Sequence, residues 1–255
     1  MTNSEILQIA MEQHAIDASC LPDDFLRNKN VLVISQPSEN ARSYLETPFF
    51  CNLITYGNNI VASVDERIYD FMDTYINTKF PHGCFELPKA HHLTKEFLKY
   101  DFLPAYQSEY WLPDINVLKS LDCSFEVRML YQHDFSGLYS SEWSNALSEK
   151  RKHLDVLGVG AYDGNKLVGL AGCSADCESM WQIGIDVLPE YRKQGIAAAL
   201  TSRLAVEVLK KGKVPFYCCA WANLSSVRNA IKSGFRPAWI EHTAVKKEKA
   251  LDWNN

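Results

Sequence analysis

Apolar and polar positions in the second half of the chain follow two periods, one typical of helices and one typical of strands. Ile196, Leu200, Leu204 and Val208 recur at every fourth residue, which predicts the buried stripe of a helix that ends near 210–212. Short apolar runs predict strands at 125–130, 156–162, 166–173, 180–187, 215–221 and 235–243. Further helices are expected across 133–153 and at 224–233. Strands that alternate with helices after an initial hairpin imply a mixed sheet covered by helices.

The first half of the chain shows similar patterns, less regularly. An amphipathic helix with Ile6, Ile9 and Ala10 on one side comes first. Strands are expected at 31–34 and 106–112, helices at 65–77 and 93–100, and a hairpin across 49–64, where Gly57-Asn58-Asn59 forms the turn. Breakers and polar residues at 113–124 then interrupt the pattern. We therefore expect a boundary near residue 120, with domains at 1–120 and 121–255.

Composition and charge narrow the class of protein. The 255 residues are 47% hydrophobic and 22% charged, a composition typical of a globular protein with a sizeable core. The net charge of −5 argues against a nucleic-acid binder with a broad basic face. The first 120 residues hold nine Lys and Arg against sixteen Asp and Glu, whereas the rest hold seventeen and fifteen. The negative charge therefore belongs to the first half.

The chain shows no targeting or membrane signal. Its N-terminus lacks a basic segment followed by an apolar one, and no apolar run approaches the length that spans a bilayer. We therefore expect a cytoplasmic protein without membrane contact, whose eight cysteines are reduced. Cys173 and Cys177 have the spacing C-x3-C, but no second pair with ligand spacing follows, so no metal site is expected.

Candidate chemistry is concentrated at 187–197, where a predicted strand ends and the long helix begins. The start of a helix exposes unpaired N–H groups and partial positive charge, which bind phosphates. Gly195 and Ala197 leave room for an anion, and Arg192 and Lys193 add positive charge. The pattern predicts a diphosphate cradle, although the six residues R-x-x-G-x-A alone also fit an ordinary helix start with exposed basic residues. The chain has no P-loop or dinucleotide-binding spacing.

The order of segments around this cradle resembles the GNAT superfamily of acyl-CoA-dependent N-acetyltransferases, over about residues 125–245. The series is IGIDV, LPEYRKQGIA, AALTSRLAVEVLKKG, PFYCCAW and NLSSVRNAIKSGF. The resemblance implies an α+β (mixed α/β) fold with a splayed sheet, preceded by a smaller α/β domain. The strands at 180–187 and 215–221 would part, and the pantetheine arm of CoA would lie between them.

The resemblance also implies contacts with the acetyl-CoA co-substrate. Backbone groups near Ile185 and Val187 would bind the pantetheine arm. The pyrophosphate would be held by Arg192, Lys193, Gln194, Gly195, Ile196 and Ala197. Asn223, and with it Ser226 and Asn229, match positions that contact the cofactor or order its loop. Asn223 and Ser226 have an alternative role, because they can simply cap the helix at 224.

The activity implied by the resemblance is transfer of an acetyl group to a primary amine, by direct attack on the thioester in a ternary complex. This chemistry needs a base, and Glu178 and Asp176 both lie just before the strand at 180–187, where a carboxylate can face the cleft. Glu178 is preferred, and the alternative is that both are solvated residues of a loop. Many family members carry a Tyr that acts as the general acid at the position where this chain has Ala230. Tyr217, Ser226 and Ser233 lie nearby in the sequence, and none of them is assigned as the acid.

The acceptor is less constrained than the donor. The acidic first half would attract a cationic amine, and a small molecule is expected rather than a protein. A homodimer is compatible with the sequence. Two alternatives belong to other classes: a catalytically silent acyl-CoA sensor, favoured by Ala230, and an interaction protein whose first domain is the functional part.

Overall fold

A computed structural model describes residues 1–78 and 81–252 of the chain. By internal contacts the chain divides into two compact units. Unit 1 comprises Met1–Ala10 and Trp111–Pro237, and unit 2 comprises Met11–Tyr110 and Ala238–Asn255. The chain passes between them within α1 (Asn3–Ala18), β4 (Phe102–Pro113) and β10 (Phe235–Lys246). The boundary expected near residue 120 stays a prediction.

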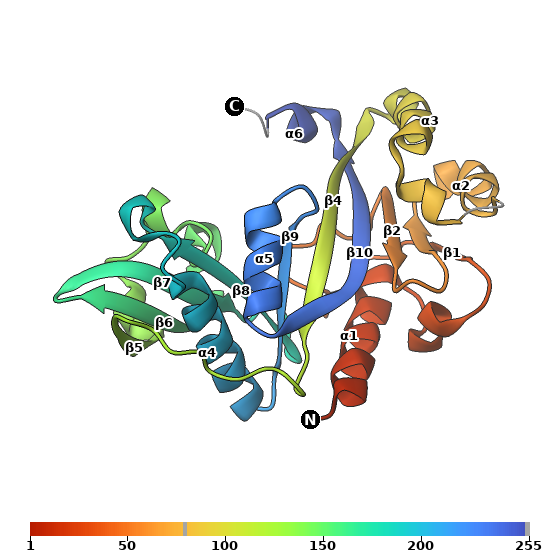
Figure 1. The fold of residues 1–255 in the computed structure, drawn as a ribbon. Coiled ribbons are helices and arrows are strands. Elements are labelled where there is room, and N and C mark those ends of the chain that lie inside the picture. The colour runs from red at the N-terminus through yellow and green to blue at the C-terminus, as the bar shows by residue number, and fades with distance from the viewer. Residues whose placement is uncertain (79–80, 253–255) are drawn as a thin grey trace. The chain divides into compact units, whose positions relative to one another are not determined.

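Unit 1 is built on a sheet with the strand order β9-β8-β7-β6-β5 (Figure 1). Its strands are β5 (Glu126–Tyr131), β6 (Asp155–Asp163), β7 (Lys166–Ser174), β8 (Met180–Val187) and β9 (Val214–Ala220). All neighbours are antiparallel except β8 and β9, which are parallel. The helices α4 (Ile196–Lys210) and α5 (Leu224–Lys232) pack against this sheet. The expected α+β fold, with a mixed sheet covered by helices, is confirmed.

The core of unit 1 forms where the sequence pattern predicts it. The predicted stripe Ile196, Leu200, Leu204 and Val208 is fully buried along α4. It packs against apolar side chains of β6, β7 and β8 in one cluster. Gly169 on β7 permits this contact, because a Cβ there would lie 2.7 Å from a methyl carbon of Ile196. The beginning of α4 is thereby held tightly against the sheet.

The segment 133–153 differs from the expected α-helices. It forms three short 3₁₀ helices, η5 (Gln132–Phe135), η6 (Ser141–Trp143) and η7 (Glu149–Leu154). Local polar contacts compete with an α-helix here, since Asp134 accepts a hydrogen bond from the backbone N–H of Tyr131 and Ser144 donates one to the carbonyl of Ser141. The backbone of 145–146 also lies so close to Gly172 and Gly184 that a Cβ at either glycine would clash with it.

Unit 2 contains a second sheet segment with the strand order β1-β3-β2-β10-β4. Its remaining elements are η1 (Pro22–Leu26), β1 (Val31–Ile34), β2 (Cys51–Thr55), β3 (Val61–Val64), η2 (Glu66–Ile68), α2 (Tyr69–Ile76), η3 (Pro81–Phe85), α3 (Leu87–Phe97), η4 (Leu98–Tyr100) and α6 (Lys247–Asp252). The predicted hairpin is present as the antiparallel pair β2–β3. Helix α3 begins six residues before the expected start at 93, because Pro88 occupies its first turn, where a proline needs no hydrogen-bond donor.

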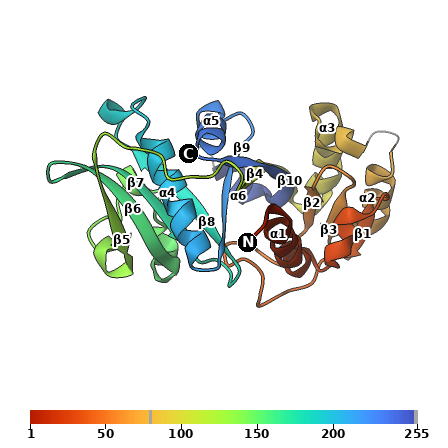
Figure 2. The ribbon, with the colours of Figure 1, turned by 60° about the horizontal axis from the view of Figure 1, so that its bottom comes forward.

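The helices of unit 2 lie on opposite faces of its sheet (Figure 2). Apolar side chains of α2 and α3 pack on the face that carries Leu53 and Ala62. His242 pairs with Leu53 across the strands and therefore shares that face, whereas the adjacent Glu241 points to the other one. His14 of α1 contacts Glu241, so α1 covers the second face.

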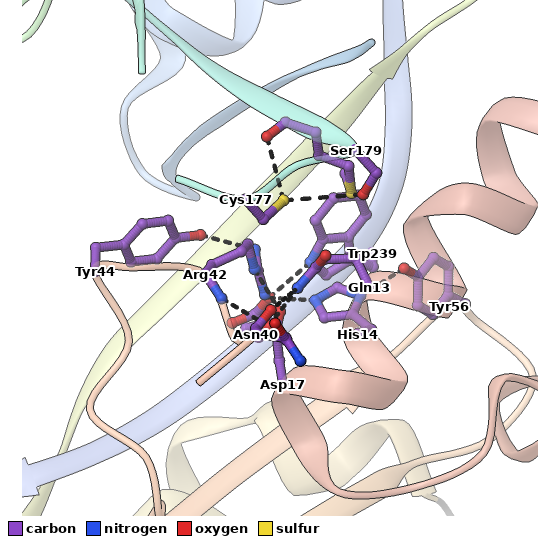
Figure 3. Close-up of polar contacts among 12 residues, drawn as sticks. Gln13, His14, Asp17, Asn40, Arg42, Tyr44, Tyr56, Cys177, Ser179 and Trp239 are labelled. Atoms are coloured by element: carbon purple, nitrogen blue, oxygen red, sulfur yellow. Dashed lines mark hydrogen bonds and ion pairs between the residues drawn. The ribbon is translucent and has the colours of Figure 1, made fainter. Parts of the chain in front are cut away.

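A buried ionic network connects α1, the loop at 40–44 and β10 (Figure 3). The guanidinium of Arg42 donates to Asp17 at 2.6 Å and to Glu241 at 2.8 Å. His14 shares a 2.6 Å hydrogen bond with the same oxygen of Glu241, and the indole of Trp239 donates to it at 2.9 Å. All these side chains are buried. Unit 2 therefore holds two carboxylates and one guanidinium away from water, and the guanidinium forms an ion pair with each carboxylate.

The protonation states within this network follow from burial and from the neighbouring charges. Burial alone would raise the pKa of Glu241, but Arg42 and His14 outweigh it and hold that pKa far below its ordinary value. Burial, together with the charge of Arg42, lowers the pKa of His14. Glu241 is therefore ionised and His14 neutral at pH 7.

No helix in the part of the chain at 1–78 and 81–252 combines the length and apolarity needed to cross a bilayer.

We expect Arg42→Met to lower the free energy of unfolding by about 3–5 kcal/mol, because it leaves Asp17 and Glu241 buried without a cation. The measurement is urea unfolding at pH 7. Lys99→Met is the control, since the Lys99–Glu96 pair is exposed on the lysine side and is worth less than about 1 kcal/mol. Equal losses in the two variants would contradict the account of the network.

The buried His242 makes stability depend on pH. Burial lowers its pKa to about 4, so between pH 6.5 and 4 the unfolded chain binds a proton that the folded chain does not. Stability is therefore lost as the pH falls through this window, by at most about 1.4 kcal/mol per pH unit from this group. We expect His242→Leu to lose less stability between pH 7 and pH 4.5 than the parent. His92→Leu, at an exposed position, should keep the parent's dependence; a parental slope in His242→Leu would refute the assignment.

Candidate functional site

The parallel strands β8 and β9 of unit 1 pair over only half of their length. Their ladder runs from Met180–Val214 to Ile183–Tyr217 and ends there, although β8 continues to Val187 and β9 to Ala220. On its other edge β8 stays paired with β7 up to Val187. The two strands therefore part after Ile183, as the resemblance implies. Among the described residues, the β9-facing edge of β8 has no paired strand from residue 184 onward.

The backbone groups freed by this parting belong to the residues expected to bind the pantetheine arm. The N–H of Leu188 donates to Val168 on the β7 side. Because successive residues of a strand direct their backbone groups to alternate edges, Ile185 and Val187 direct theirs toward the β9 side. An extended ligand that carries amide groups can pair with this edge in the manner of an added strand.

The turn after β8 is fixed by contacts at each step. Leu188 is buried, and Pro189–Tyr191 form the single 3₁₀ turn η8. The hydroxyl of Tyr191 donates to Asp163 at 2.9 Å. The guanidinium of Arg192 donates through Nε to the carbonyl of Val187 at 3.0 Å and remains exposed. The turn is therefore tied both to the β6–β7 hairpin and to the end of β8.

The cradle itself has two backbone positions with positive φ, at Lys193 (64°) and Gly195 (85°). Alternation of such conformations directs consecutive N–H groups into one concavity, a common anion-binding geometry. Gly195 precedes Ile196, the first residue of α4, and the first bond of the helix is donated by Ala199 to the carbonyl of Gly195. The preceding amides of the first turn therefore have no acceptor within the helix.

Charge around the cradle is positive. Arg192, Lys193 and Gln194 are exposed, and the side chains of Ile196 and Ala197 turn toward the protein. The partial positive charge of the helix start adds to the two cations. The six residues from 192 to 197 thus form one turn whose geometry is typical of anion sites, and their role in binding stays a prediction.

The residues of α5 that the resemblance implicates make local contacts. Asn223 is the N-cap, and its side chain accepts from the backbone N–H of Ser226 at 3.2 Å. Ser226 shares a 2.6 Å hydrogen bond with the hydroxyl of Tyr217, and Asn229 donates to the hydroxyl of Thr201 on α4 at 3.2 Å. The capping role of Asn223 is present, and the binding roles of all three residues stay predictions.

Tyr217 lies near Ala230 in the sequence, and the structure adds its contact with Ser226. Its ring is buried where the β8–β9 ladder ends, and burial raises the pKa of its hydroxyl, although the bond to Ser226 opposes that rise. Ala230, at the position of the usual Tyr, is fully buried. The Tyr217–Ser226 contact joins residues on different elements, so periodicity gives no signal for it.

The two carboxylates considered for the base lie in different surroundings. Asp176 is buried and forms an ion pair with Arg151 at 3.0 Å. Glu178 is exposed in the loop before β8. In the same loop, Cys177 donates to the carbonyl of Met180 at 3.3 Å. Among the described residues no group of three His, Cys, Asp or Glu side chains is arranged to hold a metal ion.

A family model for GNAT acetyltransferases matches residues 88–239, which is more than half of the chain. The chain belongs to the GNAT acetyltransferase family. Members of this family use acetyl-CoA, so the family identity supports an acyl-CoA-dependent acetyltransferase. The match includes β5 to β9, the cradle, α4 and α5.

Solved structures resemble the chain distantly. A GNAT-family protein from Novosphingobium aromaticivorans is 18% identical over 56% of this chain and 65% of that chain, with a TM-score of 0.46. A Drosophila protein is 13% identical over 96% of this chain and 90% of that chain, with the same TM-score. A Salmonella typhimurium protein solved with its cofactor acetyl-CoA is 15% identical over 49% and 95%, with a TM-score of 0.35. The chain thus spans slightly less than two thirds of the Novosphingobium protein. No curated protein matches it.

The space above Gly195 is open, as binding of the CoA diphosphate would require. A Cβ built on Gly195 would have only one heavy atom within 4 Å beyond its chain neighbours, so the space above this glycine is open. A side chain there would occupy that space. The residues that would hold the cofactor are Arg192, Lys193, Gln194, Gly195, Ile196 and Ala197, with Ile185 and Val187 along the freed edge.

We expect Gly195→Asp to abolish CoA binding, because its carboxylate fills the cradle with a negative charge. Gly212→Asp is a matched control: Gly212 also has a positive φ (74°) and open space around it, but it follows the other end of α4. Both variants should lose similar stability, and only Gly195→Asp should lose affinity in calorimetric titration. Unchanged affinity in Gly195→Asp would remove the cradle from the site.

Proposed function

We propose that this protein transfers the acetyl group of acetyl-CoA to the primary amine of a small cationic molecule, by direct attack within a ternary complex. The observation that carries the proposal is the parting of β8 and β9 directly before the anion-binding turn, in a chain of the GNAT family. The freed strand edge suits the amide-bearing arm of CoA, and the cradle that follows it in the chain suits the diphosphate.

Bound acetyl-CoA would supply an acyl group already activated as a thioester. The freed edge of β8 at Ile185 and Val187 would hold the amide arm, and the turn at 192–197 would hold the diphosphate. The backbone N–H of Val187, or of a residue close to it on the same edge, would donate to the carbonyl oxygen as negative charge develops there. The carbonyl of Val187 is already occupied by Arg192.

The attacking amine must lose a proton before or during attack. Glu178 is proposed as the base, directly or through water, because it is the exposed carboxylate of the loop before β8, whereas Asp176 is paired with Arg151. With Ala230 buried at the usual Tyr position, no acid is assigned.

The acceptor is proposed to be cationic and small. The first 120 residues carry a net charge of −7, with sixteen acidic and nine basic residues, whereas the cradle presents positive charge. The negative charge of residues 1–120 favours a cationic amine, and the positive charge of the cradle favours the anionic CoA. Cytoplasmic location and homodimer formation belong to the same proposal and rest on the sequence alone.

The test is release of free thiol from acetyl-CoA on a panel of amines: polyamines, amino sugars, amino acids and a lysine peptide. Turnover on a small cationic amine, with the acetamide as product, supports the proposal. Tight acetyl-CoA binding without turnover on any amine favours the silent sensor instead, and absence of binding contradicts the whole assignment.

We expect Glu178→Gln to lower kcat at neutral pH at least 10-fold and to leave the affinity for acetyl-CoA unchanged, because the base acts on the amine and not on the donor. Glu142→Gln, at another exposed position in unit 1, is the control and should behave like the parent. Parental turnover in Glu178→Gln would exclude Glu178 from the site.

A further inference from the structure

The ammonium group of Lys232 lies beside the cradle. The single heavy atom that a Cβ on Gly195 would approach is the Nζ of Lys232, at 3.9 Å. Lys232 is the last residue of α5 and stands 37 positions further along the chain than Gly195. The open space above Gly195 is therefore bordered by a cation from a second helix.

Contacts between α5 and α4 hold the end of α5 close to Gly195. The hydroxyl of Ser233, directly after Lys232, lies 3.4 Å from the carbonyl of Ala198 in the first turn of α4 and donates to the carbonyl of Asn229 at 2.7 Å. Asn229 in turn donates to Thr201 of α4. Ser233 and Ala230 are buried. The end of α5 is thereby docked on the beginning of α4, which places the backbone of Lys232 close to the cradle while its side chain stays exposed.

Several positive charges belong to the residues in and beside the cradle. The start of α4 carries partial positive charge, and Arg192 and Lys193 precede it. Within residues 1–78 and 81–252, the ion pairs at and around this helix join Lys166 to Glu190, and Arg203 and Lys210 to Glu207, and none includes Lys232. A phosphate bound in the cradle would be stabilised by these positive charges.

We propose that Lys232 is a phosphate-binding residue of the cradle that contacts the diphosphate of CoA from α5, opposite the backbone amides of the turn at 192–197. The inference rests on the proposed use of CoA and extends it. An ammonium contributes charge without a fixed bidentate geometry, so the assignment requires positive charge at this position more than a particular side chain.

The experiment is calorimetric titration of the full chain with CoA and with dephospho-CoA, which lacks the 3′-phosphate and keeps the diphosphate. The variants are Lys232→Gln, Lys232→Arg and Lys211→Gln. Lys211 is an exposed lysine at the other end of α4, about 20 Å away along a 15-residue helix, and serves as the matched control.

We expect Lys232→Gln to weaken both ligands about 10-fold, the loss typical of one charge-assisted hydrogen bond at a partly exposed site. Lys232→Arg should restore affinity to within about 3-fold, Lys211→Gln should match the parent, and thermal stability should be unchanged in all three because both side chains are exposed.

Three results would overturn the inference while the parent still binds CoA. These are parental affinity in Lys232→Gln, equal losses in Lys232→Gln and Lys211→Gln, and a loss for CoA alone, which would place Lys232 at the 3′-phosphate. Failure of the parent to bind CoA is a different outcome, since it overturns the proposed function and the inference together.

Discussion

The parting of β8 from β9 is the constraint on which the candidate site depends. A parallel ladder normally continues as far as both strands do, because an unpaired backbone group inside a sheet loses its hydrogen bond. Here the ladder stops at Ile183–Tyr217 while both strands continue. The edge of β8 that carries Ile185 and Val187 is therefore left without a strand partner, and the turn predicted to bind the diphosphate follows a few residues later.

The helices α4 and α5 of unit 1 hold the turn at 192–197 in place beside the sheet. Gly169 lets the first turn of α4 approach the sheet, and Ser233 and Asn229 dock the end of α5 on the same turn. The positive φ costs free energy at Lys193 but not at Gly195, which has no Cβ, and hydrogen bonds from Tyr191 and Arg192 anchor the same turn. Unit 2 has a different kind of organisation, in which Arg42 forms ion pairs with two buried carboxylates, Asp17 and Glu241.

Local patterns predicted the parts of this protein that depend on local physics. The period of α4 gave its buried stripe, and β8 has the bounds that its apolar run and Pro189 predict. The same reasoning missed the 3₁₀ turns at 133–153, where side chains of Asp134 and Ser144 compete with helical hydrogen bonds. Contacts between distant residues, such as Lys232 beside Gly195, have no local signal, because packing of whole helices decides them.

The central claim is that CoA binds along the freed edge of β8 and into the turn that follows it. Amide hydrogen exchange of the protein with and without CoA tests this claim most directly. The account predicts slower exchange at 185–187 and 192–198 when CoA is bound, with smaller changes elsewhere. Binding of CoA that leaves exchange in these segments unchanged, or that slows it only in unit 2, would contradict the account.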